Sequence, residues 1–401
     1  MKKTALIVIL WLACVIARAD DLPDLILPAG AGVNVHFTQG HEKDLAMIAA
    51  AGFKWVRMDF VWEAIERKKG EYDWSDYDAF SAELKKHGLR AYYILDYSNP
   101  LYEPKVVGTN PITGKVESGT TASPQHPASV AAFACWAGAA AKHFSGTGVI
   151  WEIWNEPNIS FWQPGPDVNQ YTTLALATTR AIRKNDPNAC VVAPATSCFP
   201  WDFLESVLKS GLLTNINAVS IHPYRSPNQP PESAAGEYQR LREMIQRYAP
   251  AGKNIPIISG EWGYSSNTKG VTPETQAAFI ARQQLSNLLN GVPISIWYDW
   301  KNDGPDPAEN EHNFGTVTAD LQPKPAYLAI QNLTRALAGY RINQRLKTES
   351  SADYVLSLTN LAGQTKLAAW TLDAPHSIVL ASKLKIELEA MPQYIPSIPA
   401  H

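Results

Sequence analysis

Short apolar runs alternate with longer amphipathic stretches over most of the chain. Eight runs of strand length are rich in β-branched and aromatic residues, at 32–37, 54–60, 90–95, 149–155, 189–194, 218–222, 255–260 and 294–298. Apolar residues recur at helical spacing in the stretches that follow them, at 42–51, 75–87, 127–144, 167–184, 201–212, 232–247, 275–290 and 324–337. Eight strand–helix units in about 310 residues predict a closed (β/α)8 TIM barrel. A doubly wound open sheet is the alternative, but it uses fewer units, and no glycine-rich phosphate loop follows the first run.

The pattern changes after about residue 339. Runs at 354–359, 367–371 and 377–380 have strand length and are separated by turn-like stretches. About sixty residues are too few for a robust independent core. We therefore expect a (β/α)8 barrel over 20–339 and a small all-β lobe with a tail over 340–401, completed by the chain near 22–27. The proline-rich tail from 391 is expected to be loosely ordered.

The first nineteen residues have the three parts of a secretory signal peptide. Lys2 and Lys3 precede an apolar run at 5–16, and Ala17-Arg18-Ala19 fits a small-x-small cleavage site. The run is short for a membrane span, although a retained anchor is the alternative reading. We expect a protein that is secreted or periplasmic and has no membrane contact after cleavage.

Composition excludes some function classes. The chain is 45% hydrophobic and 18% charged with a formal net charge of −3, which indicates a packed globular protein without the basic surface that nucleic acid requires. Cys135, Cys190 and Cys198 follow the leader in a spacing that fits no metal site. The sequence does not decide whether Cys135 and Cys190 form a disulfide, and it does not indicate the oligomeric state.

Two of the predicted strands end in a glutamate. Glu156 follows the fourth strand in Trp-Asn-Glu-Pro-Asn at 154–158, and Glu261 ends the seventh in Gly-Glu-Trp-Gly at 260–263. All strands of a parallel barrel open onto one face, where barrel enzymes have their active sites. We therefore expect both glutamates to face one cleft.

Paired carboxylates suit the cleavage of a glycosidic bond. One protonates the leaving oxygen, while the other attacks the sugar or activates water on the opposite face. A separation of about 5–5.5 Å gives retention of configuration, and about 6.5–9.5 Å gives inversion. A single glutamate is more often a salt-bridged or solvated residue, so the inference depends on the two contexts together.

These motifs resemble those of clan A glycoside hydrolases, most closely families 39 and 5. The resemblance covers roughly residues 30–340 and rests on an ordered set of motifs: Trp-Asn-Glu-Pro-Asn at 154–158, Phe-Trp-Gln-Pro at 161–164, Ile-His-Pro-Tyr at 221–224, Gly-Glu-Trp-Gly at 260–263, Trp-Tyr-Asp-Trp at 297–300 and Lys-Pro-Ala-Tyr at 324–327. The resemblance implies a retaining double displacement with Glu156 as acid/base and Glu261 as nucleophile. Glu261 should then be ionised, and Glu156 protonated, in the resting enzyme.

Other polar residues follow from the resemblance and from their position. Asn155 is expected to contact the sugar 2-hydroxyl, with a strand-end turn as the alternative. His222 and Tyr224 end the sixth strand, and Tyr224 is expected to donate to Glu261; the alternative for both is packing. Arg57 in the second strand needs a buried partner, either near the nucleophile or in a structural pair with Glu152 or Asp59. Glu152 itself lies deeper on its strand and is interpreted as structural.

Aromatic residues near the strand ends are candidates for sugar stacking. Trp297 is expected to form the platform beneath the reacting sugar. Other tryptophans in strand-end regions are expected either to line outer subsites or to belong to the core: Trp62, Trp162, Trp262 and Trp300. Three residues near the long loop after the third strand could also touch substrate: Tyr97, Asn99 and His126.

Two loops are long enough to affect the cleft. The segment 97–125 lacks periodicity and is expected to form a wall on one side. The segment 299–313 carries five acidic residues without the spacing of a calcium loop, and we interpret it as solvated.

The sequence therefore predicts a secreted retaining glycoside hydrolase that cleaves β-linked polysaccharide or oligosaccharide, with internal cleavage favoured. An exo-acting β-xylosidase or arabinosidase, a transglycosylase and a non-catalytic carbohydrate-binding barrel are the alternatives. The mechanism requires no cofactor or metal, and the sequence does not identify the sugar.

Overall fold

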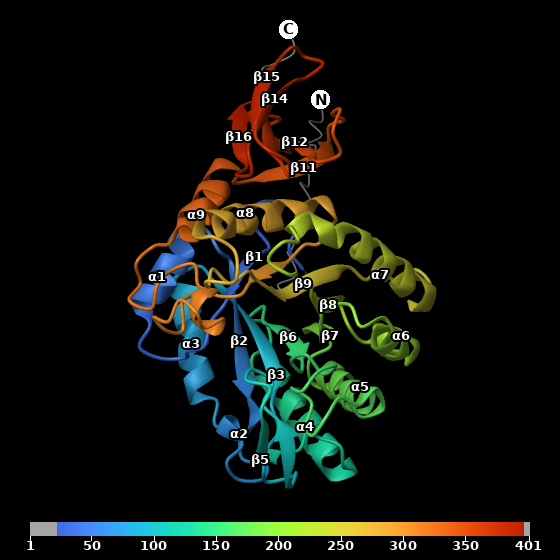
Figure 1. Ribbon diagram of the computed structural model, residues 1–401. Helices are drawn as coiled ribbons and strands as arrows, with labels where there is room; N and C mark the ends of the chain where they lie inside the picture. The colour runs from blue at the N-terminus through green and yellow to red at the C-terminus, as the bar shows by residue number, and fades with distance from the viewer. Residues whose placement is uncertain (1–21, 397–401) are drawn as a thin grey trace, which may run out of the picture.

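The computed structural model describes residues 22–396 as a closed parallel barrel with an appended β lobe (Figure 1). All eight predicted strands are present, which confirms the (β/α)8 fold. The hydrogen-bonded order around the barrel is β1-β10-β9-β8-β7-β6-β3-β2. The strands are β1 (Ala31–Asn34), β2 (Trp55–Val61), β3 (Arg90–Asp96), β6 (Ile150–Ile153), β7 (Cys190–Ser197), β8 (Ala218–His222), β9 (Ile257–Trp262) and β10 (Ser295–Trp297).

Helices follow the barrel strands as predicted, with ends that differ by a few residues. They are α1 (Glu42–Ala50), α2 (Trp62–Ile65), α3 (Ser75–Lys86), α4 (Pro127–His143), α5 (Val168–Asn185), α6 (Trp201–Lys209), α7 (Ala235–Tyr248), α8 (Pro273–Leu289) and α9 (Pro325–Ala336), with 3-10 turns η1 (Leu212–Thr214), η2 (Pro231–Ala234) and η3 (Glu311–Asn313). Local signals explain several starts. Asp167 caps α5 by accepting from two backbone amides, and proline occupies the first turn of α4, α8 and α9.

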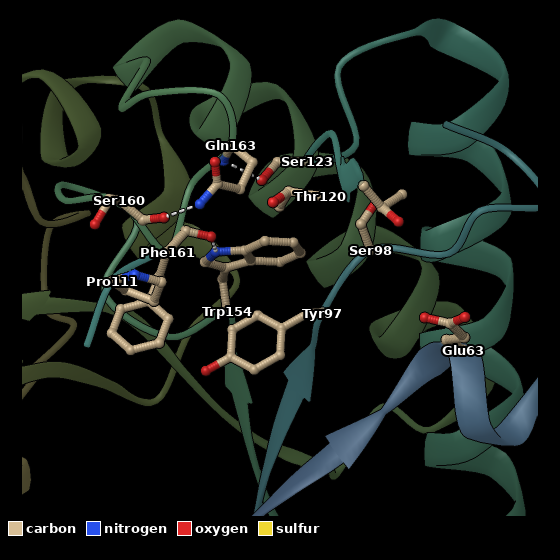
Figure 2. A pocket seen from close by; sticks show the side chains of 11 residues that line it. Glu63, Tyr97, Ser98, Pro111, Thr120, Ser123, Trp154, Ser160, Phe161 and Gln163 are labelled. Atoms are coloured by element: carbon tan, nitrogen blue, oxygen red, sulfur yellow. Dashed lines mark hydrogen bonds between the residues drawn. The ribbon is translucent and has the colours of Figure 1, made fainter. Parts of the chain in front are cut away.

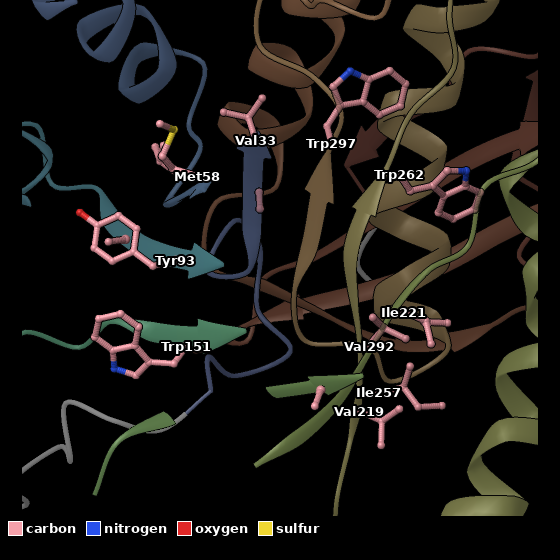
Figure 3. Close-up of a cluster of buried hydrophobic side chains, with 14 of the residues drawn as sticks. Val33, Met58, Tyr93, Trp151, Val219, Ile221, Ile257, Trp262, Val292 and Trp297 are labelled. Atoms are coloured by element: carbon pink, nitrogen blue, oxygen red, sulfur yellow. The ribbon is translucent and has the colours of Figure 1, made fainter. Parts of the chain in front are cut away.

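Two of the three apolar clusters among residues 22–396 include the barrel strands, and they result from the alternation of side chains along those strands. The large one lies between the barrel and its helices and includes Tyr93, Trp151, Trp262 and Trp297 (Figure 3). A smaller one is built from the opposite face of the strands, which is the barrel interior. It consists of Trp55, Tyr92, Ile150, Cys190, Val192, Ala218, Ile258, Ile294 and Ile296.

The long loop after β3 contains an element that the sequence pattern did not reveal. A hairpin of β4 (Lys105–Thr109) and β5 (Val116–Thr121) lies within the segment 97–125, whose sequence shows no clear periodicity. Its strands are short and largely exposed, so they carry little of the apolar alternation by which strands are recognised.

The C-terminal lobe consists of small antiparallel sheets beyond α8 and α9 (Figure 1). One has the order β11 (Tyr340–Arg345), β12 (Asp353–Asn360), β13 (Thr365–Thr371) and β16 (Gln393–Pro396), and the other pairs β14 (His376–Val379) with β15 (Lys385–Leu388). The tail was expected to be loose, but β16 pairs with β13 and completes the sheet. The segment 22–27 forms no strand there; its Leu27 instead exchanges backbone hydrogen bonds with Gly339 and Tyr340.

One buried polar cluster holds the lobe to the barrel. The Trp370 indole Nε1 donates to Glu232 Oε1 over 2.7 Å, and Glu232 accepts both Nε and Nη2 of Arg282 at 2.8 Å. Trp370 is fully buried within the large core, so the lobe packs on the barrel through apolar as well as charged contacts.

Some predictions concern the chain outside these elements. The predicted signal peptide, residues 1–19, lies outside the described residues. Among residues 22–396, no helix combines the length and apolarity needed to cross a membrane. No disulfide joins Cys135, Cys190 and Cys198 in this part of the chain.

Candidate active site

A cavity of about 480 Å³ opens at the carboxyl ends of the barrel strands. Residues from most strand ends line it, together with the hairpin tip and the loop after β10: Asn34, His36, Arg57, Asp59, Tyr97, Pro111, Ile112, Asn155, Glu156, Ile159, Phe161, Ser197, Tyr224, Glu261, Tyr298, Asn310, Glu311 and Phe314. Both candidate glutamates therefore face one cavity, and the long loop after β3 forms part of its wall.

Glu156 stands where strand β6 has ended. Its backbone has a φ of 45°, and Trp154 two residues earlier has a φ of 67°, so two bulky residues adopt the left-handed region. Such conformations cost about 1–3 kcal/mol each and persist only where surrounding contacts hold them. Here the Glu156 amide donates to Ala195 O over 3.0 Å, and His222 Nδ1 lies 3.0 Å from Glu156 Oε1. The turn directs this carboxyl group into the cavity.

Glu261 is held by two donors. Its Oε2 accepts a hydrogen bond from Arg57 Nη1, and Tyr224 Oη donates to Oε1 over 2.7 Å. The residue before it must be glycine, because a Cβ on Gly260 would come within 2.3 Å of Ser220 Oγ and 2.8 Å of Glu152 Oε1. The Gly-Glu motif thus leaves room for the polar cluster beneath the nucleophile candidate.

The two candidate carboxyl groups lie close together. One oxygen of Glu156, one of Glu261 and one nitrogen of His222 all fall within 4.8 Å of one another. His222 Nδ1 is 3.0 Å from Glu156 Oε1 and 4.0 Å from Glu261 Oε1. A single buried imidazole therefore bridges the pair.

Arg57 connects the site to the barrel interior. Its guanidinium donates to Glu152 Oε2 from Nε over 2.8 Å and to Asn155 Oδ1 from Nη2 over 2.9 Å, besides its bond to Glu261. The structural partner and the nucleophile partner, which were alternatives in the sequence, are both present. Glu152 is fully buried and also accepts from Tyr92 Oη over 2.7 Å, as expected of a structural residue.

Contacts between opposite charges set the pKa values of Glu261, His222 and Glu152. Burial alone would raise the pKa of Glu261, but the charges of Arg57 and His222 and the Tyr224 hydrogen bond hold it below its ordinary value. Burial would likewise lower the pKa of His222, but Glu261, Glu152 and Glu156 raise it to about 9. Arg57 and other partners lower the pKa of Glu152 to about 2 against its own burial. The expectation that Glu261 is ionised agrees with this arrangement.

Asn155 lies between Arg57 and Tyr97. It accepts from Arg57 through Oδ1, and its Nδ2 donates to Tyr97 Oη over 3.3 Å. The side chain is 6% exposed and lines the cavity, so it is placed to meet a substrate hydroxyl.

Glu156, His222 and Glu261 offer three donor atoms that could surround a cation. Metal ligands must be deprotonated, yet the pKa of His222 is raised to about 9. Glu261 already uses both oxygens on Arg57 and Tyr224. The donor set thus fits a proton-transfer site better than a metal site.

The tryptophans predicted to bind substrate lie elsewhere. Trp297, Trp162 and Trp300 are at most 1% exposed and line no part of the cavity. Their indoles donate to Phe314 O, Gln170 Oε1 and Asp44 Oδ1. The prediction of a Trp297 platform was wrong because Ile296 points into the barrel, so its neighbour Trp297 points outward to the helices. Trp62 and Trp262 are likewise core residues.

Two of the weaker candidates also lie away from the cavity. Asn99 is fully buried and donates to Glu66 O over 2.8 Å, and His126 Nδ1 is 2.8 Å from Glu103 Oε2. Tyr97, in contrast, lines the cavity.

Several cavity residues were not identified from the sequence. Tyr298, next to Trp297, faces the cavity, and period-two alternation along the strand would have selected it. Glu311 lines the cavity and receives a 3.3 Å hydrogen bond from Tyr298 Oη, so the acidic loop is not merely solvated. His36 lies 3.6 Å from Asp299; its pKa would fall on burial, but this partner raises it to about 9. No local motif announces Glu311 or His36.

Comparison with known proteins agrees with this geometry. A family model described as Cellulase (glycosyl hydrolase family 5) matches residues 28–304. The chain belongs to this family. It is a member of a glycoside hydrolase family, and the predicted resemblance to clan A enzymes is confirmed.

Two curated relatives of the hydrolase are named Beta-xylosidase. One, from Caldicellulosiruptor saccharolyticus, is 24% identical over 230 residues, which cover 53% of this chain and 46% of the relative. The other, from Geobacillus stearothermophilus, is 26% identical over 205 residues, which cover 45% of this chain and 40% of the relative. The matched segments thus span less than half the length of either relative.

Solved structures share the fold over nearly the whole hydrolase. A family 39 glycoside hydrolase from the gut symbiont Bacteroides cellulosilyticus WH2 matches with a TM-score of 0.78 and 25% identity, covering 94% of this chain and 82% of that one. A GH39 beta-xylosidase from Caulobacter crescentus matches with a TM-score of 0.64 and 21% identity, covering 89% and 80%. The second likeness concerns the fold alone.

Proposed function

We propose that this glycoside hydrolase cleaves β-glycosidic bonds of a polysaccharide or oligosaccharide by a retaining double displacement. Glu261 is the nucleophile and Glu156 the acid/base. The single observation that carries the proposal is the approach of the two carboxyl groups, with one oxygen of each within 4.8 Å. An inverting pair needs about 6.5–9.5 Å to admit a water molecule, whereas a retaining pair stands at about 5–5.5 Å.

In the first step Glu261 attacks the anomeric carbon while Glu156 gives its proton to the leaving oxygen. Arg57 and Tyr224 keep Glu261 ionised and fix both of its oxygens, so the attacking group is oriented before substrate arrives. His222 faces Oε1 of Glu156, which leaves Oε2 to carry the transferable proton. Asn155 can donate to the 2-hydroxyl as oxocarbenium character develops.

At the start of the second step the Glu261 carboxylate is esterified to the anomeric carbon and has lost its charge. Glu156, now a carboxylate, removes a proton from water, and the water oxygen attacks the anomeric carbon from the face that the leaving group vacated. Glu261 leaves as a carboxylate, stabilised again by Arg57 and Tyr224. Two inversions give net retention.

The relatives named Beta-xylosidase favour a second candidate, an exo-acting β-xylosidase. Internal cleavage stays a prediction, as does secretion into the periplasm or the medium. An endo enzyme would release a ladder of intermediate products from a long chain, whereas an exo enzyme would release one small product from the start.

The decisive experiment is a screen of the purified protein against β-linked polysaccharides and aryl β-glycosides, with Glu156→Gln as control. On any substrate that is cleaved, Glu156→Ala is then assayed with azide. A retaining acid/base variant is expected to regain activity and to yield the β-glycosyl azide. Formation of the α-azide would reverse the assignment of the two glutamates. A wild-type product of inverted configuration in nuclear magnetic resonance would overturn the retaining mechanism.

Transglycosylation shares the same intermediate and is separated by its products. At high acceptor concentration a hydrolase still gives mainly free sugar, whereas a transglycosylase gives longer chains. Fractionation of the host cells with an antibody tests secretion, and a cytoplasmic protein that retains residues 1–19 would refute it.

A further inference from the structure

A second cavity of about 270 Å³ adjoins the one that holds the two glutamates. Tyr97, Pro111 and Phe161 line both cavities. Tyr97 links the two cavities. Its hydroxyl accepts a hydrogen bond from Asn155 in the first cavity, and its ring lines the second. A molecule bound at the glutamates can therefore extend into this neighbouring space.

One part of the second cavity is aromatic. The Tyr97 and Phe161 rings are nearly parallel, with centroids 5.8 Å apart and planes 10° apart, and Trp154 meets Tyr97 edge-on at 5.7 Å. Figure 2 shows these three side chains gathered together, with Glu63 opposite them at the start of α2. Aromatic surfaces of this kind pack against the C–H groups of a sugar ring.

The rest of the lining is polar and partly without protein partners. The hydroxyls of Thr120 and Ser160 and the carboxylate of Glu63 make no side-chain hydrogen bond or ion pair with any of residues 22–396. Thr120 comes from hairpin strand β5, so this cavity exists only because the hairpin stands beside the strand ends. An aromatic cluster beside solvent-accessible hydroxyl and carboxylate groups matches a ring with hydroxyl substituents (Figure 2).

The volume of the second cavity indicates that it holds a single sugar unit. The volume of about 270 Å³ lies just below the range of about 300–1,000 Å³ typical of sites for drug-sized ligands. One more sugar ring fits this space better than a long chain does.

We propose that this second cavity, the hairpin cavity, binds the sugar unit that adjoins the sugar held at the two glutamates. The enzyme therefore prefers oligosaccharides to single-sugar glycosides. This inference rests on the proposed function. The hairpin β4–β5 is then a specificity element, and Thr120, Ser160 and Glu63 are residues that recognise hydroxyl groups of that adjoining ring.

The test blocks the second cavity and leaves the first one intact. Thr120→Trp is compared with wild type on two substrates: the shortest oligosaccharide that the substrate screen shows to be cleaved, and the β-glycosyl fluoride of its single sugar. Fluoride is a one-atom leaving group, so this substrate occupies only the cavity with the glutamates. The matched control is Ser118→Trp, an exposed residue of the same strand that does not line the cavity.

We expect Thr120→Trp to lower kcat/KM for the oligosaccharide at least tenfold and to leave kcat/KM for the fluoride within twofold. Ser118→Trp should change neither. Equal losses on both substrates, or no loss on the oligosaccharide, would overturn the inference. Ser160→Tyr fills the cavity from the other side and should reproduce the selective loss if Thr120→Trp does not fold. Should the screen find no cleaved oligosaccharide and wild type hydrolyse no β-glycosyl fluoride, the proposed function itself fails.

Discussion

The two ends of the barrel interior are built from the same strands but have opposite character. At the amino-terminal end the inward side chains are apolar, such as Trp55, Ile150 and Ile258. Two residues further along the first two of these strands stand Arg57 and Glu152, both at most 1% exposed. One end closes by apolar packing, and the other by charges that neutralise one another.

The difference separates stability from chemistry within one fold. Apolar packing stabilises by removing surface from water, whereas buried ions at best recover their desolvation cost through excellent geometry. At the charged end three carboxylates find a donor: Glu152 and Glu261 share Arg57, and Glu156 faces His222. We therefore expect substitutions at the charged end to lower activity and substitutions at the apolar end to lower stability.

The largest effect is expected at the charged end. Glu261→Gln removes the nucleophile and should lower kcat/KM on the order of 10⁴-fold or more, at or above the about 10²–10⁴-fold that acid–base assistance supplies. The matched control is Glu232→Gln, a buried glutamate on the lobe side, which should lower the melting temperature but leave kcat unchanged. Steady-state kinetics would refute the assignment if Glu261→Gln kept a tenth of the activity.

The apolar end should fail by unfolding. Ile258→Ala on strand β9 leaves a cavity beneath the same strand that carries Glu261, and it should lower the free energy of unfolding by about 2–5 kcal/mol. Urea denaturation measures the loss. Because no cavity-lining group changes, the folded variant should keep the wild-type KM, and a raised KM would show that the two ends are not independent.

A smaller effect sharpens the electrostatic half of the comparison. Tyr224→Phe removes a donor from Glu261, so the pKa of this carboxyl group should rise and the acid limb of the kcat/KM profile should move to higher pH. Activity at neutral pH should fall at least about tenfold, as for a hydrogen bond to a charged group. A profile that keeps its acid limb would mean that Tyr224 does not stabilise the ionised nucleophile.

The smallest effect concerns stability against pH. Burial alone would lower the pKa of His222, but its carboxylate neighbours raise it from 6.5 to about 9. The stabilising contribution of the protonated ring is therefore complete below about pH 6.5 and is lost as the pH rises through about 9. The melting temperature should fall over this window in wild type and less so in His222→Gln. Parallel curves for the two proteins would contradict a charged His222.

Sequence reasoning succeeded at the strand-end glutamates and failed at the aromatic residues. Strand ends and their glutamates were predictable because a local motif carries them, as at Glu156 and Glu261. The role of Trp297 was mistaken because composition does not say toward which side of a closed strand a ring points. Tyr298 faces the cavity instead, as alternation along its strand would have indicated, whereas only the course of the chain in space places the hairpin residue Thr120 beside the second cavity.

By itself the sequence determined the order of strands and helices, the closure into a barrel and the pair of glutamates. These features follow from short-range periodicity and from the rule that parallel strands open onto one face. The tertiary structure alone decided how near the two carboxyl groups stand, which partners Arg57 shares between them, and that a short hairpin adds a second cavity beside the first. The physical reason is that distances, desolvation and pKa values arise from side chains that lie far apart in the chain, so no local pattern can record them.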